Sequence, residues 1–283
     1  MAGGGNDFVL IDSRGGRITD AADLTRRICT RRLSVGADGL ILIENSSRAS
    51  FRMRYYNADG SLGEFCGNGT RCAARFALLN VIAGRKMTIE TDAGVVSAEV
   101  AENGSVTISL PPPHGFRGVK PLTIGSVTVQ GSPITVGVPH YVIFLTGDLW
   151  RQQIEPLGRA IRNHPEMQPA GTNVNFVVVR DDHNIEVRTY ERGVEAETLS
   201  CGSGVVAAVA VSTLFGKVEP PVSVLTRSGI KLDVLMINAG GELRDVRLRG
   251  DARMVYRAAL TPETVDGFDP EFVRDPTFHT VAT

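Results

Sequence analysis

The chain has 283 residues, of which 42% are hydrophobic and 22% charged, a composition typical of one large globular domain or two smaller ones. Its 30 Lys and Arg side chains nearly balance 31 Asp and Glu side chains. This balance argues against nucleic acid or an anionic membrane as the main partner, because phosphate binding requires clustered positive charge. The sequence has no apolar run near the ~20 residues of a membrane helix and no secretory signal, so we expect a cytoplasmic protein.

Taken in chain order, the hydrophobic patterns predict two mixed α/β units. Helical patterns cover residues 20–32, 70–80, 149–163 and 204–215. Alternating or β-branched runs predict strands at residues 40–44, 51–56, 86–90, 95–100, 106–110, 124–130, 174–180, 185–190, 222–226, 231–237 and 244–248. A proline-rich break at 111–115 favours a first domain of residues 1–115, completed by the tail 259–283, and a second domain of residues 116–258.

The two halves share a pattern around two cysteines. Cys66 and Cys201 each begin a CGxG motif, 201 − 66 = 135 positions apart, and an apolar stretch typical of a buried helix follows each motif. Thr91 and Thr226 then begin similar turns, 91 − 66 = 25 and 226 − 201 = 25 residues beyond their cysteines. These landmarks in register predict an internal duplication, with one cysteine in each domain.

The chain has four cysteines, and their positions predict two different roles. They are too few for a disulfide scaffold and lack the CxxC spacing of a structural zinc site, so we expect no metal. Cys29 and Cys72 lie within apolar helical segments and are expected in the core. Cys66 and Cys201 each open a helix after a polar turn, where the helix N-terminus favours a thiolate and binds anions.

A pair of thiols in equivalent positions fits racemisation. One thiolate removes the α-proton of an amino acid, and the other thiol delivers a proton to the opposite face of the planar carbanion. Two such thiols would titrate as a coupled pair that holds one proton. The sequence has no lysine motif for pyridoxal phosphate (PLP) and no glycine-rich phosphate fingerprint, so no cofactor is expected.

Eight short segments spread over nearly the whole chain carry a resemblance to a known family. They are Gly5-Asn6-Asp7-Phe8, Gly36-Ala37-Asp38-Gly39, Asn57-Ala58-Asp59-Gly60, Cys66-Gly67-Asn68-Gly69, Pro139-His140, Asn173-Val174-Asn175-Phe176, Glu191-Arg192-Gly193 and Cys201-Gly202-Ser203-Gly204. With these segments the chain resembles the PLP-independent diaminopimelate epimerases. The resemblance implies an α/β fold (α+β mixed sheets) of two pseudo-symmetric domains. Each domain is a curved mixed sheet around a central helix, and the active site lies in the interdomain cleft.

The resemblance also implies a function and residue roles. The function is interconversion of LL- and meso-diaminopimelate, for lysine and peptidoglycan, by a cofactor-free homodimer. Cys66 and Cys201 correspond to the acid/base pair, and His140 and Glu191 to positions that matter for catalysis. The implied substrate-binding residues are Asn6, Asn57, Gly67, Asn68, Asn173, Glu191, Arg192, Gly202 and Ser203. Of these, the residues of the two helix starts would meet the α-carboxylate, and Arg192 would clamp the distal carboxylate.

Two departures from the family pattern keep alternatives open. Val138 and Gly39 stand where many members have Asn and Gln, which removes two polar groups from the pocket edge. Another cofactor-independent racemase of the same architecture, acting on proline, hydroxyproline or histidine, therefore stays an alternative. An isomerase resembling phenazine-biosynthesis enzymes would use no thiol pair, and the presence of both cysteines argues against it. The third alternative is a non-catalytic amino-acid-binding module.

Overall fold

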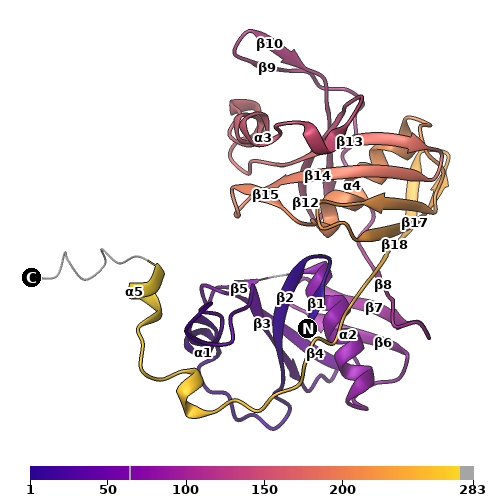
Figure 1. The fold of residues 1–283 in the computed structure, drawn as a ribbon. Coiled ribbons are helices and arrows are strands. Elements are labelled where there is room, and N and C mark those ends of the chain that lie inside the picture. The colour runs from indigo at the N-terminus through magenta and orange to yellow at the C-terminus, as the bar shows by residue number, and fades with distance from the viewer. Residues whose placement is uncertain (64, 275–283) are drawn as a thin grey trace, which may run out of the picture. The chain divides into compact units, whose positions relative to one another are not determined.

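The structure, a computed structural model, describes residues 1–63 and 65–274 and divides into two compact units (Figure 1). Unit 1 comprises Met1–Val106 and the chain from Ala252 onward, and unit 2 comprises Thr107–Asp251. Glu64 and residues 275–283, which belong to the expected Cys66 segment and tail, lie outside the described residues.

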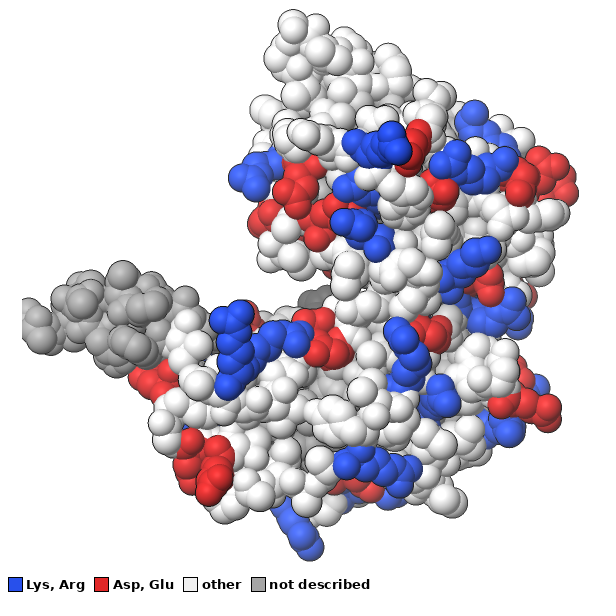
Figure 2. Space-filling model, viewed as in Figure 1, with Lys and Arg blue, Asp and Glu red and all other residues white. Residues whose placement is uncertain are grey.

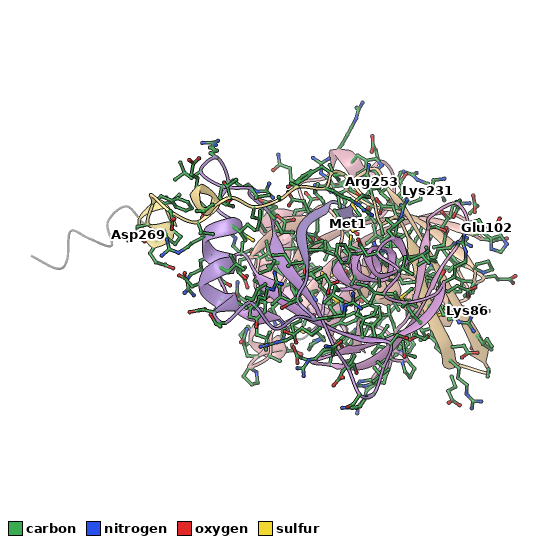
Figure 3. The ribbon with its side chains drawn as sticks, turned by 90° about the horizontal axis from the view of Figure 1, so that it is seen from below. Met1, Lys86, Glu102, Lys231, Arg253 and Asp269 are labelled. Carbon is green, nitrogen blue, oxygen red and sulfur yellow. The ribbon has the colours of Figure 1, made fainter. Side chains whose placement is uncertain are left out.

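The division between the units lies earlier than the proline-rich break at 111–115. Strand β8 (Val106–Ser109) is hydrogen-bonded beside β18 (Glu242–Gly250), and the Leu110 amide donates to Val246 O at 2.9 Å, so this segment joins unit 2. The chain rejoins unit 1 at Ala252, before the expected residue 259. The amide of Ala2 donates to Arg253 O at 2.9 Å, and Met1 and Arg253 lie near each other in Figure 3.

In unit 1, runs of two or three strands are separated by the helices α1 and α2. Its elements are β1 (Ala2–Gly3), β2 (Asn6–Asp12), α1 (Ala21–Ile28), β3 (Gly39–Glu44), β4 (Phe51–Asn57), β5 (Leu62–Gly63), α2 (Gly67–Leu79), β6 (Lys86–Thr91), β7 (Gly94–Val100), η3 (Pro262–Thr264) and α5 (Pro270–Arg274). The segment around η3 is held against α1, because Arg27 Nη1 donates to Val265 O at 3.0 Å and Ser34 Oγ donates to Thr264 O at 2.6 Å.

Unit 2 has the same order of elements. They are β9 (Leu122–Ile124), β10 (Val127–Val129), β11 (Ser132–Val136), β12 (Val138–Phe144), η1 (Leu149–Arg151), α3 (Glu155–Arg162), η2 (Pro165–Met167), β13 (Asn173–Asp181), β14 (Asn184–Glu191), β15 (Ala196–Thr198), α4 (Gly202–Leu214), β16 (Val222–Leu225), β17 (Lys231–Ala239) and β18. After the β9–β10 hairpin, the strands and α-helices from β11 to β17 repeat those from β1 to β7, and the 3-10 turns η1 and η2 are additions.

Strand pairing confirms the duplication that the two cysteine motifs predict. In unit 1 the strand order is β1-β2-β3-β4-β6-β7, with parallel pairs at β2/β3 and β4/β6. In unit 2 the order runs β11-β12-β13-β14-β16-β17, with parallel pairs at β12/β13 and β14/β16. Short strands β5 and β15 pair with β4 and β14. Helix α2 follows β5 and helix α4 follows β15, so the two cysteine-led helices occupy equivalent places.

A central helix forms the core of each unit. Every residue from Gly204 to Thr213 of α4 is buried, and α4 contacts β11, β12, β13, β14 and β17 (Figure 1). A helix that is apolar on all sides requires such surroundings. Helix α2 contacts β1, β2, β3, β4, β6 and β7, and its residues Asn68–Ala74 are buried. Cys72 on α2 and Cys29 at the end of α1 are 0% and 4% exposed, which confirms their expected burial.

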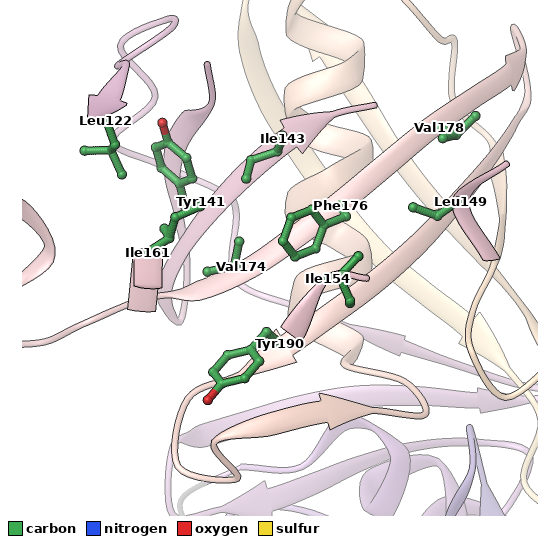
Figure 4. Close-up of a cluster of buried hydrophobic side chains, with 10 residues drawn as sticks. All are labelled: Leu122, Tyr141, Ile143, Leu149, Ile154, Ile161, Val174, Phe176, Val178 and Tyr190. Carbon is green, nitrogen blue, oxygen red and sulfur yellow. The ribbon is translucent and has the colours of Figure 1, made fainter. Parts of the chain in front are cut away.

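A second hydrophobic cluster covers the other face of the unit 2 sheet (Figure 4). It consists of Leu122, Tyr141, Ile143, Leu149, Ile154, Ile161, Val174, Phe176, Val178 and Tyr190. Because side chains alternate across a strand, His140, Asn175 and Thr189 lie on the opposite face of β12, β13 and β14, toward α4. The alternation of side chains along the strands thus places these three polar side chains on the face that α4 covers.

Two predicted elements of unit 2 are broken in the structure. The helix expected over 149–163 is a 3-10 turn at Leu149–Arg151 followed by α3, because Pro156 is accommodated only near a helix start. The strand expected over 124–130 is the β9–β10 hairpin, which turns at Gly125 with φ +62°.

Charged side chains of both signs are mixed on the face shown in Figure 2. Many form ion pairs, such as Arg52–Asp92 at 2.7 Å in unit 1 and Arg249–Asp233 at 2.9 Å in unit 2. Within residues 1–63 and 65–274, the helices are all too short or too polar to cross a membrane.

Candidate active site

Cys66 and Cys201 are the N-cap residues of α2 and α4, which confirms that each opens a helix. Both have extended backbones, with φ −139° at Cys66 and −111° at Cys201. The Gly69 amide donates to Cys66 Sγ at 3.4 Å, and Cys201 Sγ lies 3.6 Å from Ser203 Oγ. All four cysteines of the chain are thiols. The positive end of a helix dipole stabilises a thiolate at either position.

In unit 1, the structure brings together four of the predicted residues: Asn6, Cys66, Gly67 and Asn68, here called the unit 1 cluster. Gly67 and Asn68 form the first turn of α2, and Asn68 Nδ2 donates to Asn6 Oδ1 at 2.8 Å. Asn57 ends β4, and its side chain donates to Ser61 Oγ at 3.0 Å.

In unit 2, the corresponding group is the unit 2 cluster: His140, Asn173, Glu191, Arg192, Cys201, Gly202 and Ser203. Glu191, at the end of β14, accepts a hydrogen bond from Thr198 Oγ1 at 2.7 Å and one from the thiol of Cys201. Burial raises the pKa of Glu191 above its ordinary value, and these two hydrogen bonds oppose the shift. Cys201 therefore has a carboxyl group as its direct neighbour, whereas Cys66 is capped by a backbone amide.

Arg192 and Asn173 are tied to each other and to the backbone. The Arg192 amide donates to Asn173 Oδ1 at 2.7 Å, and Arg192 Nη1 donates to Ala170 O at 3.0 Å. Because a guanidinium has five N–H donors, Arg192 keeps donors for an anionic ligand. The carbonyl of Ala170 fixes one edge of the guanidinium and so pre-orients the rest.

His140 is 1% exposed and belongs to a buried polar network. Thr189 Oγ1 donates to Asn175 Oδ1 at 3.0 Å, and Asn175 Nδ2 lies 3.2 Å from His140 Nδ1. Since Asn175 presents its NH₂ group to Nδ1, the hydrogen of the imidazole is on Nε2. His140 Nε2 is buried and has no hydrogen-bond partner among the residues that the structure describes. A buried donor of this kind costs about 1–3 kcal/mol until a ligand or water accepts from it.

Because residue 204 is glycine, the start of α4 can pack closely against this polar network. A Cβ at Gly204 would lie 2.3 Å from Asn175 Oδ1 and 3.2 Å from Thr189 Oγ1. The start of α4 therefore packs directly on the buried amide that orients His140.

Burial lowers the pKa of His140 to about 3, and the nearby charge of Arg192 contributes. The unfolded chain binds a proton on this histidine below its ordinary pKa of about 6.5, and the folded protein does so only near 3. Stability from this group is therefore present above pH 6.5 and is lost as pH falls toward 3.

We expect the unfolding free energy of the wild type to fall between pH 6.5 and 5 by up to about 1.4 kcal/mol per pH unit more than that of His140→Gln. Urea denaturation at several pH values measures this. His114→Gln, at an exposed histidine, is the control, and equal slopes in wild type and His140→Gln would contradict the assignment.

The structure explains why Gly39 carries no side chain. A Cβ there would lie 2.4 Å from Tyr56 O and 2.6 Å from a ring carbon of Tyr55, and the same ring lies 2.5 Å from a Cβ built at Gly63. The Tyr55 ring thus fills the space beside both Gly39 and Gly63. Val138 begins β12, two residues before His140.

Four polar side chains that hold the predicted ones were not identified from the sequence. These are Asp38 and Arg71 in unit 1 and Asn175 and Thr189 in unit 2. Asp38 and Asn175 stand within the motifs quoted for the resemblance, and the i, i+3 spacing of Asn68 and Arg71 on one helix was a usable signal. Within the described part of the chain, no group of three or more His, Cys, Asp or Glu residues has the arrangement to hold a metal ion.

Solved structures place the fold in a class. The chain superposes on a PhzF-family phenazine biosynthesis protein from Bacillus anthracis with a TM-score of 0.62 at 16% identity, covering 87% of this chain and 90% of the other. A probable proline racemase from Agrobacterium radiobacter K84 gives a TM-score of 0.62 at 18% identity, with coverage of 85% and 82%. The fold is therefore the one that the PhzF-family protein and the probable proline racemase share.

The sequence comparisons narrow this class to one family. The family model described as diaminopimelate epimerase matches residues 1–113 and 133–254. A diaminopimelate epimerase from Aquifex aeolicus (strain VF5) is 45% identical over 278 residues, which cover 94% of this chain and 98% of that relative. The chain belongs to the diaminopimelate epimerase family and is an isomerase.

Proposed function

We propose that the protein interconverts LL- and meso-2,6-diaminopimelate by proton transfer between Cys66, Cys201 and the substrate α-carbon. One observation carries the proposal: the two thiols occupy the same N-cap position in two units of the same topology. A reaction that inverts one carbon needs a base and an acid on opposite faces, and a duplicated unit supplies one of each. Family membership supports the substrate.

The proton balance of the proposed reaction is simple. One cysteine thiolate takes the α-proton and becomes a thiol, and the C–H electron pair remains on the α-carbon. The other cysteine then gives its proton to the opposite face and becomes the thiolate. No oxidant, reductant or cofactor is consumed, and the enzyme finishes with the single proton on the other sulfur. The reverse reaction exchanges the two roles.

Electrostatic stabilisation of the carbanion comes from the helix starts. The first N–H groups of α2 and α4, at Gly67, Asn68, Gly202 and Ser203, are proposed to hold the α-carboxylate, where negative charge grows in the transition state. Preorganised donors of this type each contribute about 3–4 kcal/mol to the transition state in other enzymes. The dipoles of these two helices also favour the thiolate form that starts the reaction.

Recognition of the rest of the substrate is assigned to polar side chains. Arg192 is proposed to clamp the distal carboxylate, since Ala170 O already orients its guanidinium. Glu191, Asn6, Asn57 and Asn173 are proposed to bind the amino and carboxylate groups. The same proposal places the enzyme in the cytoplasm, as a homodimer, in the supply of lysine and peptidoglycan precursors.

The proposed function is tested with reduced wild-type enzyme in D2O. LL-diaminopimelate, L-proline, trans-4-hydroxy-L-proline and L-histidine are incubated separately, and Cα deuterium and stereochemistry are followed by NMR. We expect deuterium and the meso isomer from diaminopimelate alone. Exchange in proline, hydroxyproline or histidine without any in diaminopimelate would replace the proposed substrate. Binding of diaminopimelate without exchange at any α-carbon would identify a binding module.

A further inference from the structure

A directed chain of hydrogen bonds runs through the unit 1 cluster. Arg71 Nη2 donates to Asn68 Oδ1 at 2.7 Å, and Asn68 Nδ2 donates to Asn6 Oδ1 at 2.8 Å. Asn6 Nδ2 in turn donates to Asp38 Oδ2 at 2.9 Å. The chain therefore leads from a cation through two amides to a carboxylate.

The two ends of this chain determine the direction of both amides. A guanidinium can only donate and a carboxylate can only accept, whereas an asparagine amide can turn over and present either atom. With Arg71 at one end and Asp38 at the other, the amides of Asn68 and Asn6 each have one orientation that satisfies every bond. Each amide then offers its remaining N–H and lone pair in a fixed direction.

Both end residues are held in place. Arg71 is 0% exposed and also donates to Gly67 O at 3.4 Å, in the first turn of α2. Asp38 accepts from the Asp7 amide at 3.2 Å and from Arg31 Nη2 at 2.9 Å. Gly4, with φ +60°, leaves room for Asn68, because a Cβ at residue 4 would lie 2.5 Å from Asn68 Oδ1. An ordinary surface ion pair would have none of this support.

The fold itself does not require a buried arginine at this position. The equivalent residue of α4 is 71 + 135 = 206, and Val206 is 0% exposed within a helix of the same length and topology. Burying an arginine is unfavourable unless hydrogen bonds or an opposite charge compensate for its lost hydration. Valine is sufficient for packing at this place in α4. The presence of Arg71 in α2 is therefore explained by its hydrogen bond with Asn68, whose amide it orients.

We infer that Arg71 and Asp38 are the positioning residues of the unit 1 cluster, which fix the amide directions of Asn68 and Asn6 for the substrate. The inference rests on the proposed function only in that Asn6 and Asn68 bind substrate. The fixed amides would determine specificity, because Asn6 and Asn68 present one defined pattern of hydrogen-bond donors and acceptors beside Cys66. Substrate groups with the opposite pattern are rejected there.

Asp38→Asn is the principal test, because it keeps the shape of the side chain and allows both amides to turn over. We expect kcat/KM for LL-diaminopimelate to fall about 100-fold, the effect of misplacing a positioned group, with both kcat and KM affected. In ¹⁵N-labelled protein, solvent exchange of the side-chain NH₂ hydrogens of Asn6 and Asn68 is expected to become about tenfold faster, which corresponds to about 1.4 kcal/mol. Arg71→Met, which removes the other end, is expected to act in the same direction, and Arg71→Lys to recover part of the loss.

Matched controls are a carboxylate on β2, the strand that carries Asn6, and an arginine on α2, the helix that carries Arg71. Asp12→Asn removes a carboxylate from β2 that pairs with Arg14 at 2.7 Å, and Arg75→Met removes an arginine one turn further along α2 that donates to Ala252 O. Both controls are expected to leave kcat/KM and the amide exchange of Asn6 and Asn68 unchanged.

Amide exchange in Asp38→Asn equal to that of the wild type would overturn the inference, whatever the activity. So would a loss of kcat/KM no larger than in Asp12→Asn. If the wild type fails to epimerise diaminopimelate, the proposed function is wrong, while the amide exchange still decides the positioning role.

Discussion

Replacing Cys66 or Cys201 by alanine is expected to lower kcat for epimerisation by about 10²- to 10⁴-fold, the range for loss of a positioned acid or base. Each cysteine caps one of two equivalent helices, so neither can substitute for the other. Substrate binding is expected to survive both changes, since the backbone donors at the helix starts remain. The measurement is meso-diaminopimelate formation together with calorimetric titration of the substrate.

Cys29→Ala and Cys72→Ala are the matched controls for this prediction. Both thiols are buried in unit 1, at 4% and 0% exposure, and no proposed step uses them. Their removal is expected to cost some stability through lost packing and to leave kcat within a few-fold of the wild type. Full activity in Cys66→Ala or Cys201→Ala, or equal losses in all four variants, would refute the thiol mechanism.

Glu191→Gln is expected to lower kcat about 100-fold and to make the protein more stable at neutral pH. Glu191 accepts a hydrogen bond from the Cys201 thiol, and burial raises its pKa. A neutral amide keeps the hydrogen bond with Thr198 but removes the charge that holds the proton on Cys201. The substitution is therefore expected to change both the magnitude of kcat and its dependence on pH.

The stability effect follows from proton linkage. A carboxyl whose pKa is raised on folding binds more protons in the folded than in the unfolded state, above the ordinary value of about 4.3. Stability from this group is thus highest below its ordinary pKa and decreases as pH rises through the raised pKa. Glutamine does not titrate, so the stability advantage of Glu191→Gln is expected to be larger at pH 8 than at pH 4.5, because the increase occurs as pH rises through the raised pKa. Urea denaturation of both proteins over this range measures it. A Glu191→Gln protein that is less stable than the wild type at pH 8 would contradict this account of the site.

Much of the fold was predictable because it is duplicated. The spacing of Cys66 and Cys201 gave two independent views of one unit, and long regular strands such as β13 and β17 showed clear patterns. Short elements escaped prediction: β5 and β15 have two and three residues, too few for any periodicity. The break before α3 was signalled by Pro156, but the strong amphipathic pattern around it outweighed that signal.

The candidate site was predictable in its motifs and not in its supporting contacts. Residues such as Asn6 and Asn68 stand in recognisable segments, but their hydrogen bond joins positions 62 residues apart. The same holds for Asn175, which reaches His140 only because β12 and β13 run parallel in a particular register. Long-range pairs of this kind depend on strand register and helix placement, which a single sequence does not specify.

Two different thiols are proposed to act on one α-carbon, and the isotopic content of the first product tests this mechanism most directly. LL-diaminopimelate of natural isotopic composition is converted in D2O to less than about a tenth of equilibrium, and both isomers are analysed by NMR and mass spectrometry. Two thiols on opposite faces predict one α-deuterium in the meso product, while the remaining LL substrate keeps its protium. In Cys66→Ala and Cys201→Ala this product is expected to disappear. Meso product that retains the original α-proton would show that a single base carries the proton from one face to the other, and would contradict the account.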